Sequence, residues 1–286
     1  MLGRRGTLRF LVAPPVAWLV LFFVVPLVLI AAFSLRAGSG AVGPDEPWAA
    51  SVDQYAELAG TPAFLRLLGL SVLVAIVVGV LATLLAYPIA YFLAFRAGRR
   101  ASVYLTLLLI PFAVSYLLRV MAWKLMLGPE GGVNSLLSFL GLTDEPIELL
   151  LYSRPAVIIT LVYVWVPFAA LPIYAAMQRI DRHQLEAAAD LGAGPWSRFW
   201  RVTIPLSLPG ALVTFFMVFI PTVGEYVTPA LVGGTDGIMY GNIIQGFFTR
   251  SANWPLGSAM AMTMLVLTLA VVLVGLRGVN VRRALS

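Results

Sequence analysis

The chain alternates long apolar runs with short polar segments rich in arginine, glycine and proline. A helix rises about 1.5 Å per residue, so a run of about 20 apolar residues crosses the hydrocarbon core of a bilayer. Six runs reach this length, and we expect each of them to form one transmembrane helix. Their approximate bounds are residues 11–33, 67–95, 103–127, 155–177, 206–232 and 256–276.

The composition supports a membrane protein. Of the 286 residues, 60% are hydrophobic and 11% are charged, and the mean hydropathy is +0.94. This is far from the composition of soluble domains. The length leaves little beyond six helices and their loops, so we expect one all-α polytopic domain over residues 1–286 and no separate catalytic domain. The absence of cysteine excludes disulfides, thiol chemistry and Cys-based metal sites.

The arginines predict the orientation in the membrane. If the N-terminus is cytoplasmic, most of the basic residues fall in cytoplasmic segments, whereas most carboxylates fall in outer loops, which is the bias that the positive-inside rule requires. Both termini are then cytoplasmic, and the first apolar run is an uncleaved helix because it is longer than a signal-peptide core. The net charge of +6 reflects this topology and contact with anionic lipid, and requires no nucleic-acid partner. The predicted cytoplasmic arginines are Arg4, Arg5, Arg9, Arg96, Arg99, Arg100, Arg179, Arg182, Arg198, Arg201, Arg277, Arg282 and Arg283.

The cytoplasmic loop 178–205 is longer than a connection between helices requires. Residues 183–191 are good helix formers, and the glycines at 192 and 194 are expected to end that helix. Pro195 suits the first turn of a second helix, and Pro205 marks the return to the bilayer. A short exposed helix of this kind is typical of an element that a soluble partner pushes.

The same loop carries a family signature. Glu-Ala-Ala at 186–188, Gly192, the aliphatic residues Val202 and Ile204, and Pro205 stand at the spacing of the signature loop in permeases of binding-protein-dependent ABC importers, which this chain resembles. Valine and isoleucine replace the usual isoleucine and leucine. The resemblance implies that the loop docks an ATPase, with the contacts made by Glu186, Ala187, Ala188, Gly192 and Pro205.

Further segments resemble spermidine/putrescine importer permeases and extend the likeness to nearly the whole chain. The resemblance implies the type I importer permease fold, the bacterial inner membrane, and alternating access powered from outside the chain. It also implies three kinds of partner: a second homologous permease, two ATP-binding subunits that hold ATP and Mg, and a periplasmic or lipid-anchored substrate-binding protein. The segments are 111–112, 116–119, 122–124, 150–152, 162–164 with 167–168, 224–227 followed by Pro229, 241–244 and 253–257.

No motif in the chain supports catalysis or a cofactor. The only lysine, Lys124, lies between Trp123 and Leu125, so there is no phosphate-binding P-loop. The single histidine, His183, has no set of partners for metal binding or for a catalytic triad. We therefore expect a transport subunit that is not an enzyme, with ATP hydrolysed elsewhere.

Three residues are candidates for the substrate pathway. Glu225 is a carboxylate at membrane depth, where ionisable groups usually face a cavity or a partner. It could meet a cationic substrate, with Tyr226 offering an aromatic face to an ammonium group. Alternatively, it pairs with Arg119 or caps a helix broken near Pro229. Arg119 itself either anchors its helix at the membrane interface, or contacts a partner or pairs with another charged group.

The sequence leaves two other functions open. A permease of the same fold could import another solute, such as a phosphonate, thiamine, ferric ion or an opine, because the docking loop does not select among them. An ion-driven secondary transporter is the other alternative, but it predicts paired intramembrane carboxylates and no long docking loop. Among these possible substrates, the resemblance favours a polyamine.

Overall fold

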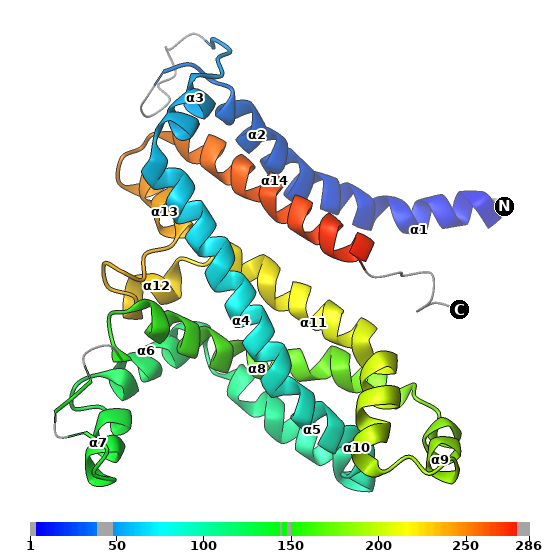
Figure 1. The fold of residues 1–286 in the computed structure, drawn as a ribbon. Helices are drawn as coiled ribbons and strands as arrows, with labels where there is room; N and C mark the ends of the chain where they lie inside the picture. Colours follow the sequence, from blue (N-terminus) through cyan, green and yellow to red (C-terminus); the bar gives the residue numbers. More distant parts are fainter. Residues whose placement is uncertain (1–3, 39–47, 144, 148–149, 279–286) are drawn as a thin grey trace. The chain divides into compact units, whose positions relative to one another are not determined.

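We analysed a computed structural model that describes residues 4–38, 48–143, 145–147 and 150–278 (Figure 1). Its elements in the described residues are helices, and five of them are long and apolar enough to cross a membrane. Those spans are Leu11–Ser34, Pro62–Phe95, Arg154–Gln178, Pro195–Val223 and Trp254–Arg277. A bent pair of helices, Gly98–Ala113 and Tyr116–Phe139, makes a sixth span if it is counted as one. The predicted all-α, polytopic fold is confirmed.

The described residues divide into two compact units, each described here by itself. Unit 1 comprises the described residues within 1–66 and 243–267, and unit 2 comprises those within 67–242 and 268–286. The elements in chain order are α1 Arg4–Leu19, η1 Val20–Val24, α2 Val25–Ser34, α3 Asp53–Gly60, α4 Pro62–Phe95, η2 Gly98–Arg100, α5 Ala101–Leu109, η3 Ile110–Ala113, α6 Tyr116–Leu127, α7 Gly132–Phe139, α8 Arg154–Gln178, α9 Arg182–Asp190, α10 Pro195–Arg198, η5 Phe199–Thr203, α11 Ile204–Val223, α12 Val227–Val232, α13 Tyr240–Thr249 and α14 Trp254–Gly278.

Aromatic contacts hold unit 1 together. The ring of Phe33, at the end of α2, lies 5.8 Å from the ring of Trp254 at the start of α14, edge to face. The hydroxyl of Tyr55 in α3 donates to Ser34 Oγ at 2.8 Å, which ties the segment after α2 back to that helix. Phe64 and Phe247 form a further edge-to-face pair at 6.0 Å. These contacts fix the helix ends in this unit.

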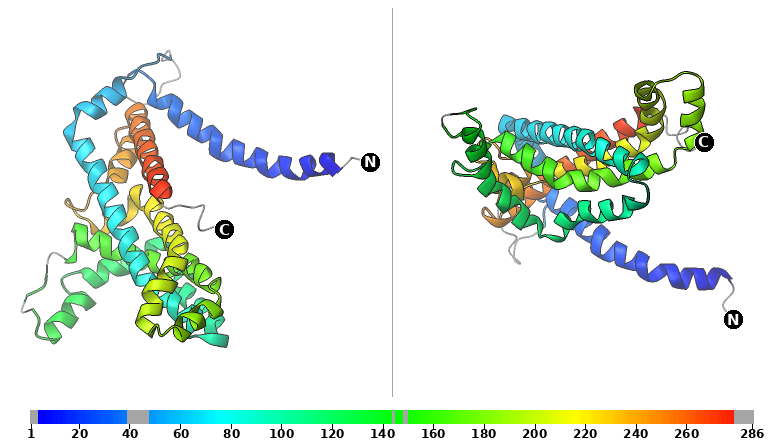
Figure 2. Two further views of the ribbon diagram at one scale, coloured as in Figure 1. Left: turned by 45° about the vertical axis from the view of Figure 1, so that its right-hand side comes forward. Right: turned by 90° about the horizontal axis from the view of Figure 1, so that it is seen from below.

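The core of unit 2 is built from α4, α8 and α11, and α8 and α11 run side by side (Figure 1, Figure 2). Small residues line the buried face of α4, where alanines recur at positions 75, 82, 86 and 90. Small side chains let helix backbones approach closely, which is how helices associate where no hydrophobic force distinguishes protein from lipid. Thr214 of α11 adds a buried hydrogen bond to the carbonyl of Ala169 in α8 at 3.0 Å.

Gly210 sets the distance between α8 and α11. A Cβ atom at this position would lie 2.5 Å from Ala176 Cβ and 2.8 Å from the carbonyl oxygen of Pro172. We expect Gly210→Val to destabilise the protein by about 1–3 kcal/mol, since overpacking forces the helices apart. Thermal unfolding of the purified protein in detergent measures the change. Gly69→Val is the matched control, because a Cβ on Gly69 of α4 meets nothing within 4 Å; equal loss in both variants would contradict the packing role.

The third predicted helix, 103–127, is not continuous. The chain forms α5 and the short turn η3, then bends by 85° into α6. Pro111 lies in the 3₁₀ turn, and Val114 and Ser115 adopt extended conformations with ψ of 139° and 138°. Proline has no backbone N–H, so the helix lacks one hydrogen bond at this point. Breaking the helix here therefore costs less free energy than elsewhere.

The fifth predicted helix, 206–232, differs at both ends. Its helical span begins at Pro195, because α10, η5 and α11 are continuous, and Pro205 lies in the first turn of α11. The π turn η5 directly precedes this proline: the N–H of Ile204 donates to Phe199 O, and Pro205 itself has no N–H to donate. The other end is Val223, after which a break separates α11 from α12.

Candidate functional site

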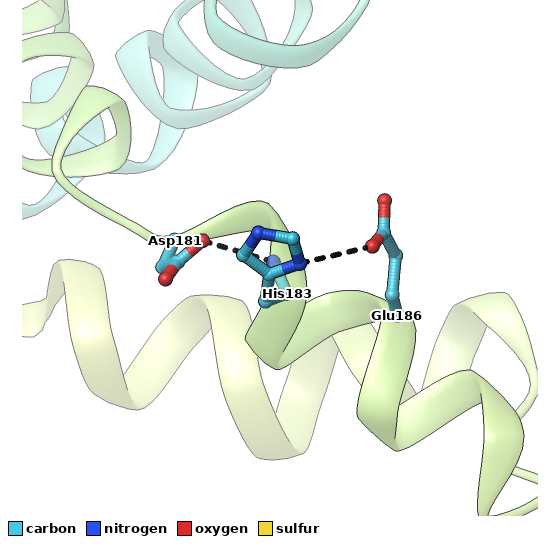
Figure 3. Close-up of polar contacts among 3 residues, drawn as sticks. All are labelled: Asp181, His183 and Glu186. Carbon is cyan, nitrogen blue, oxygen red and sulfur yellow. Dashed lines mark hydrogen bonds and ion pairs between the residues drawn. The ribbon is translucent and has the colours of Figure 1, made fainter.

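The predicted docking helix is present as α9, between the long helices α8 and α10–α11 of unit 2 (Figure 1). It begins after Asp181, whose carboxylate accepts a hydrogen bond from the backbone N–H of His183 at 3.0 Å (Figure 3). This is a standard N-cap, since an acidic side chain satisfies one of the free donors of the first turn. The Asp181 cap was not recognised from the sequence, although an aspartate just before a run of helix formers is a usual signal.

The end of α9 is a Schellman motif. The N–H of Gly192 donates to Ala189 O at 2.9 Å, and the N–H of Ala193 donates to Ala188 O at 3.0 Å. Gly192 has φ +81°, the left-handed conformation that glycine adopts without steric cost. Pro195 then opens α10 after Gly194. The predicted break at 192–194 and restart at Pro195 are both found in the structure.

The outer surface of α9 is available to another protein. The Glu186 side chain is 67% exposed, and its Oε2 lies 3.4 Å from Nδ1 of His183, which is also exposed (Figure 3). Ala187 is exposed and Ala188 is half-buried, so the surface beside Glu186 is formed by methyl groups. Leu191 is 89% exposed at the end of the helix. Pro205 is exposed but lies in α11, outside this surface.

The cap of α9 yields a prediction about the loop. We expect Asp181→Ala to fray the first turn of α9 at a cost of about 0.5–2 kcal/mol, because the N–H of His183 loses its acceptor. Limited trypsin digestion at Arg182 should then run faster by about 2–30-fold. Asp181→Asn is the matched control, since asparagine caps as well as aspartate; unchanged cleavage in Asp181→Ala would contradict the role of the cap.

The candidate pathway residues gather around the break between α11 and α12. Glu225 Oε1 accepts hydrogen bonds from the backbone N–H groups of Val227 at 2.8 Å and Thr228 at 3.1 Å. Glu225 therefore caps α12. Capping a broken helix was one of the two structural alternatives for this residue; the other was a pair with Arg119. Tyr226 is exposed, and its carbonyl accepts from Asn242 Nδ2 at 2.7 Å. The break is thus fixed from both sides.

Tyr116 connects Arg119 to this break, because it contacts both Arg119 and Thr228. The hydroxyl of Tyr116 in α6 hydrogen-bonds Thr228 Oγ1 at 2.6 Å. The Arg119 guanidinium lies over the ring of Phe112 at 4.5 Å and that of Tyr116 at 5.9 Å, and the residue is only 8% exposed. Its Nε has no hydrogen-bond partner, and no ion pair between Arg119 and Glu225 occurs in the part of the chain that the structure describes.

Sequence reasoning missed three residues of this cluster. Tyr116, Thr228 and Asn242 connect α6, α12 and the start of α13 to the break. Gly241 allows the close approach, since a Cβ there would lie 2.7 Å from the carbonyl oxygens of Gly224 and Glu225. Polar residues inside apolar runs were the available signal, but nothing in their spacing shows which of them meet.

These features define a multi-pass helical membrane protein with an exposed helical loop and a broken helix beside a buried charge. The chain belongs to the family described as binding-protein-dependent transport system inner membrane component, whose profile matches residues 86–286. It is 32% identical over 260 residues to the spermidine/putrescine transport system permease protein PotB of Haemophilus influenzae, covering 88% of this chain and 86% of that protein. The PotB of Escherichia coli K12 is also 32% identical, over 88% of this chain and 90% of its own.

A solved structure shares the fold. The crystal structure of a bacterial ABC transporter involved in the import of the acidic polysaccharide alginate matches with a TM-score of 0.77 and 18% identity, covering 96% of both chains. The chain is therefore a multi-pass inner-membrane permease of a binding-protein-dependent ABC importer, which works with a periplasmic binding protein. It is a transport component and not an enzyme, and ATP is hydrolysed on a partner ATPase. The family and fold predicted from the sequence are confirmed.

Proposed function

We propose that this chain is the permease of a polyamine importer, with α9 as the ATPase-docking element and the break at Glu225 as part of the substrate pathway. The main support for this substrate class is the similarity to two PotB permeases, at 32% identity over most of each chain. Residues 1–286 then act as one permease domain beside a second homologous permease, and two ATP-binding subunits dock on the cytoplasmic loop 178–205. Both termini are cytoplasmic in this proposal, which the arginine distribution supports.

The structure supports the docking role through α9. This helix is short, capped at both ends and exposed, so a partner that contacts Glu186 and the alanine surface moves it as a rigid piece. Because α10, η5 and α11 form one continuous helix, a displacement at Pro195 reaches the break at Gly224 along a single element. ATP binding closes the ATPases, the loop moves, and the pathway opens toward the loaded binding protein; hydrolysis resets it.

The pathway role rests on the chemistry around the break. Glu225 supplies a negative charge, the exposed ring of Tyr226 supplies a π face, and both attract an ammonium group. Accepting hydrogen bonds from the α12 backbone leaves the Glu225 carboxylate negatively charged, so it still attracts a cation. The buried Arg119 is the feature that favours the alternative solute class, an anion, because its Nε has no hydrogen-bond partner among the described residues.

Substrate-stimulated ATP hydrolysis tests the proposal. The complex is reconstituted with its binding protein and assayed with spermidine and putrescine, and then with phosphonate, molybdate, ferric ion, thiamine and an opine. Stimulation by the polyamines alone supports the proposed substrate. Stimulation by an anion alone would overturn the substrate assignment while leaving the docking role of α9 intact.

A further inference from the structure

A small cavity lies beneath the docking helix, at the ends of two membrane spans. It has a volume of about 250 Å³ and is lined by residues at the end of α4, one side chain of α9, and the α10–η5 segment. Its lining combines two arginines with aromatic and aliphatic groups. The lining residues are Tyr91, Phe95, Arg96, Leu185, Pro195, Arg198, Phe199 and Thr203.

The two arginines are not neutralised by the protein. Neither Arg96 nor Arg198 forms an ion pair with an acidic residue in the described ranges. The Nε atom of Arg198 is buried and has no hydrogen-bond partner. A buried donor without an acceptor is costly, so native proteins usually supply one from a ligand, water or ion. The cavity, which is open on one side, therefore presents one unsatisfied buried donor, Arg198 Nε, and the uncompensated positive charge of both arginines, of which Arg96 is exposed.

The rest of the cavity has the composition of the membrane interface. The span Pro62–Phe95 ends immediately before Arg96, and the span Pro195–Val223 begins at the cavity. Trp196 and Trp200 beside it are 72% and 52% exposed, and tryptophan is enriched at the level of lipid headgroups. Phe199 packs edge to face on Tyr91 at 5.5 Å, so an aromatic pair forms part of the cavity lining.

We propose that this cavity binds the phosphate group of an anionic membrane lipid, held by Arg96 and Arg198. Guanidinium groups match phosphate oxygens in charge and in geometry. The phosphate supplies the acceptor that Arg198 Nε lacks, and the acyl chains leave along the apolar residues of α4 and η5. A soluble phosphate offers the same chemistry, but the position at two span ends beside exposed tryptophans favours a lipid. The leaflet is the cytoplasmic one if the proposed orientation is correct.

Lipid binding is measured on the full-length chain in its purified complex, by native mass spectrometry with phosphatidylglycerol titrated into detergent. We expect one phosphatidylglycerol to bind more tightly than phosphatidylcholine. Each arginine removed should weaken that binding about fivefold, so Arg96→Gln combined with Arg198→Gln should weaken it by about 20-fold or more. Arg201→Gln is the matched control, because Arg201 is an exposed arginine of η5 that does not line the cavity. The measurement requires no transport substrate, so it succeeds or fails independently of the polyamine assignment.

Three results would overturn the proposal. The first is equal affinity for phosphatidylglycerol in the wild type and in the double glutamine variant. The second is displacement of the lipid from the wild type by millimolar inorganic phosphate, which would assign the cavity to a soluble phosphate. The third is loss of the ATP-binding subunits from the double variant with lipid affinity unchanged, which would assign it to an acidic side chain of a partner. If the double glutamine variant does not fold, Arg198→Lys replaces it; it keeps the charge, removes the Nε donor, and should weaken lipid binding by a smaller factor.

Discussion

The Glu186→Lys complex is expected to lose substrate-stimulated ATP hydrolysis by at least about tenfold while the chain still inserts into the membrane. The exposed carboxylate lies on the surface of α9 that we assign to the ATPase, and placing a like charge against a partner costs several kcal/mol at an interface. The assay compares ATPase activity with and without loaded binding protein, in complexes matched for the amount of permease.

The loss is not explained by the stability of α9. Among the residues that the structure describes, Glu186 forms an ion pair with His183, at 3.4 Å, and both side chains are largely exposed. An exposed pair of this kind contributes at most about 1 kcal/mol, and often nothing measurable. Gln184→Lys is the matched control, because it introduces a lysine at an exposed position of the same helix. Stimulation that survives in Glu186→Lys, or that is lost equally in Gln184→Lys, would count against Glu186 as a docking residue.

The structure of the loop 178–205 could be predicted from the sequence because it is local. The left-handed conformation of Gly192 and the helix start at Pro195 follow from the backbone preferences of those two residues. The start of the fifth span could not be predicted in the same way. Pro205 has the sequence signature of a boundary, but the π turn η5 allows the helix to pass through it. A proline inside the chain therefore shows where a helix is perturbed and not whether it ends.

The same contrast holds at the break after α11. The sequence shows Gly224 and Glu225 in an apolar run, which predicts an unusual position but not its geometry. Whether Glu225 pairs with Arg119 or caps α12 depends on where α6 and α12 lie, and these helices are far apart in the sequence. Tyr116 and Thr228 were missed for this reason. Contacts between distant elements are fixed by packing, which the periodicity of a single sequence does not encode.

Replacing Glu225 separates its cap from its charge. Glutamine retains a carbonyl oxygen where Glu225 Oε1 accepts from Val227 and Thr228, so Glu225→Gln should keep α12 capped. Alanine removes both the acceptor and the charge. If the carboxylate meets a polyamine, Glu225→Gln should lower uptake by about tenfold or more with the protein yield unchanged, since a hydrogen bond to a charged group contributes about 1.5–3 kcal/mol.

Uptake of labelled spermidine into proteoliposomes, divided by the amount of assembled complex, measures this effect. Glu130→Gln is the matched control, because it removes one exposed carboxylate from the segment between α6 and α7 without touching the break. Glu225→Ala should lower assembly as well as uptake, since the lost cap costs about 0.5–2 kcal/mol. Normal uptake in Glu225→Gln together with poor assembly in Glu225→Ala would restrict Glu225 to the cap of α12, and the cation would then have to be recognised elsewhere in the pathway.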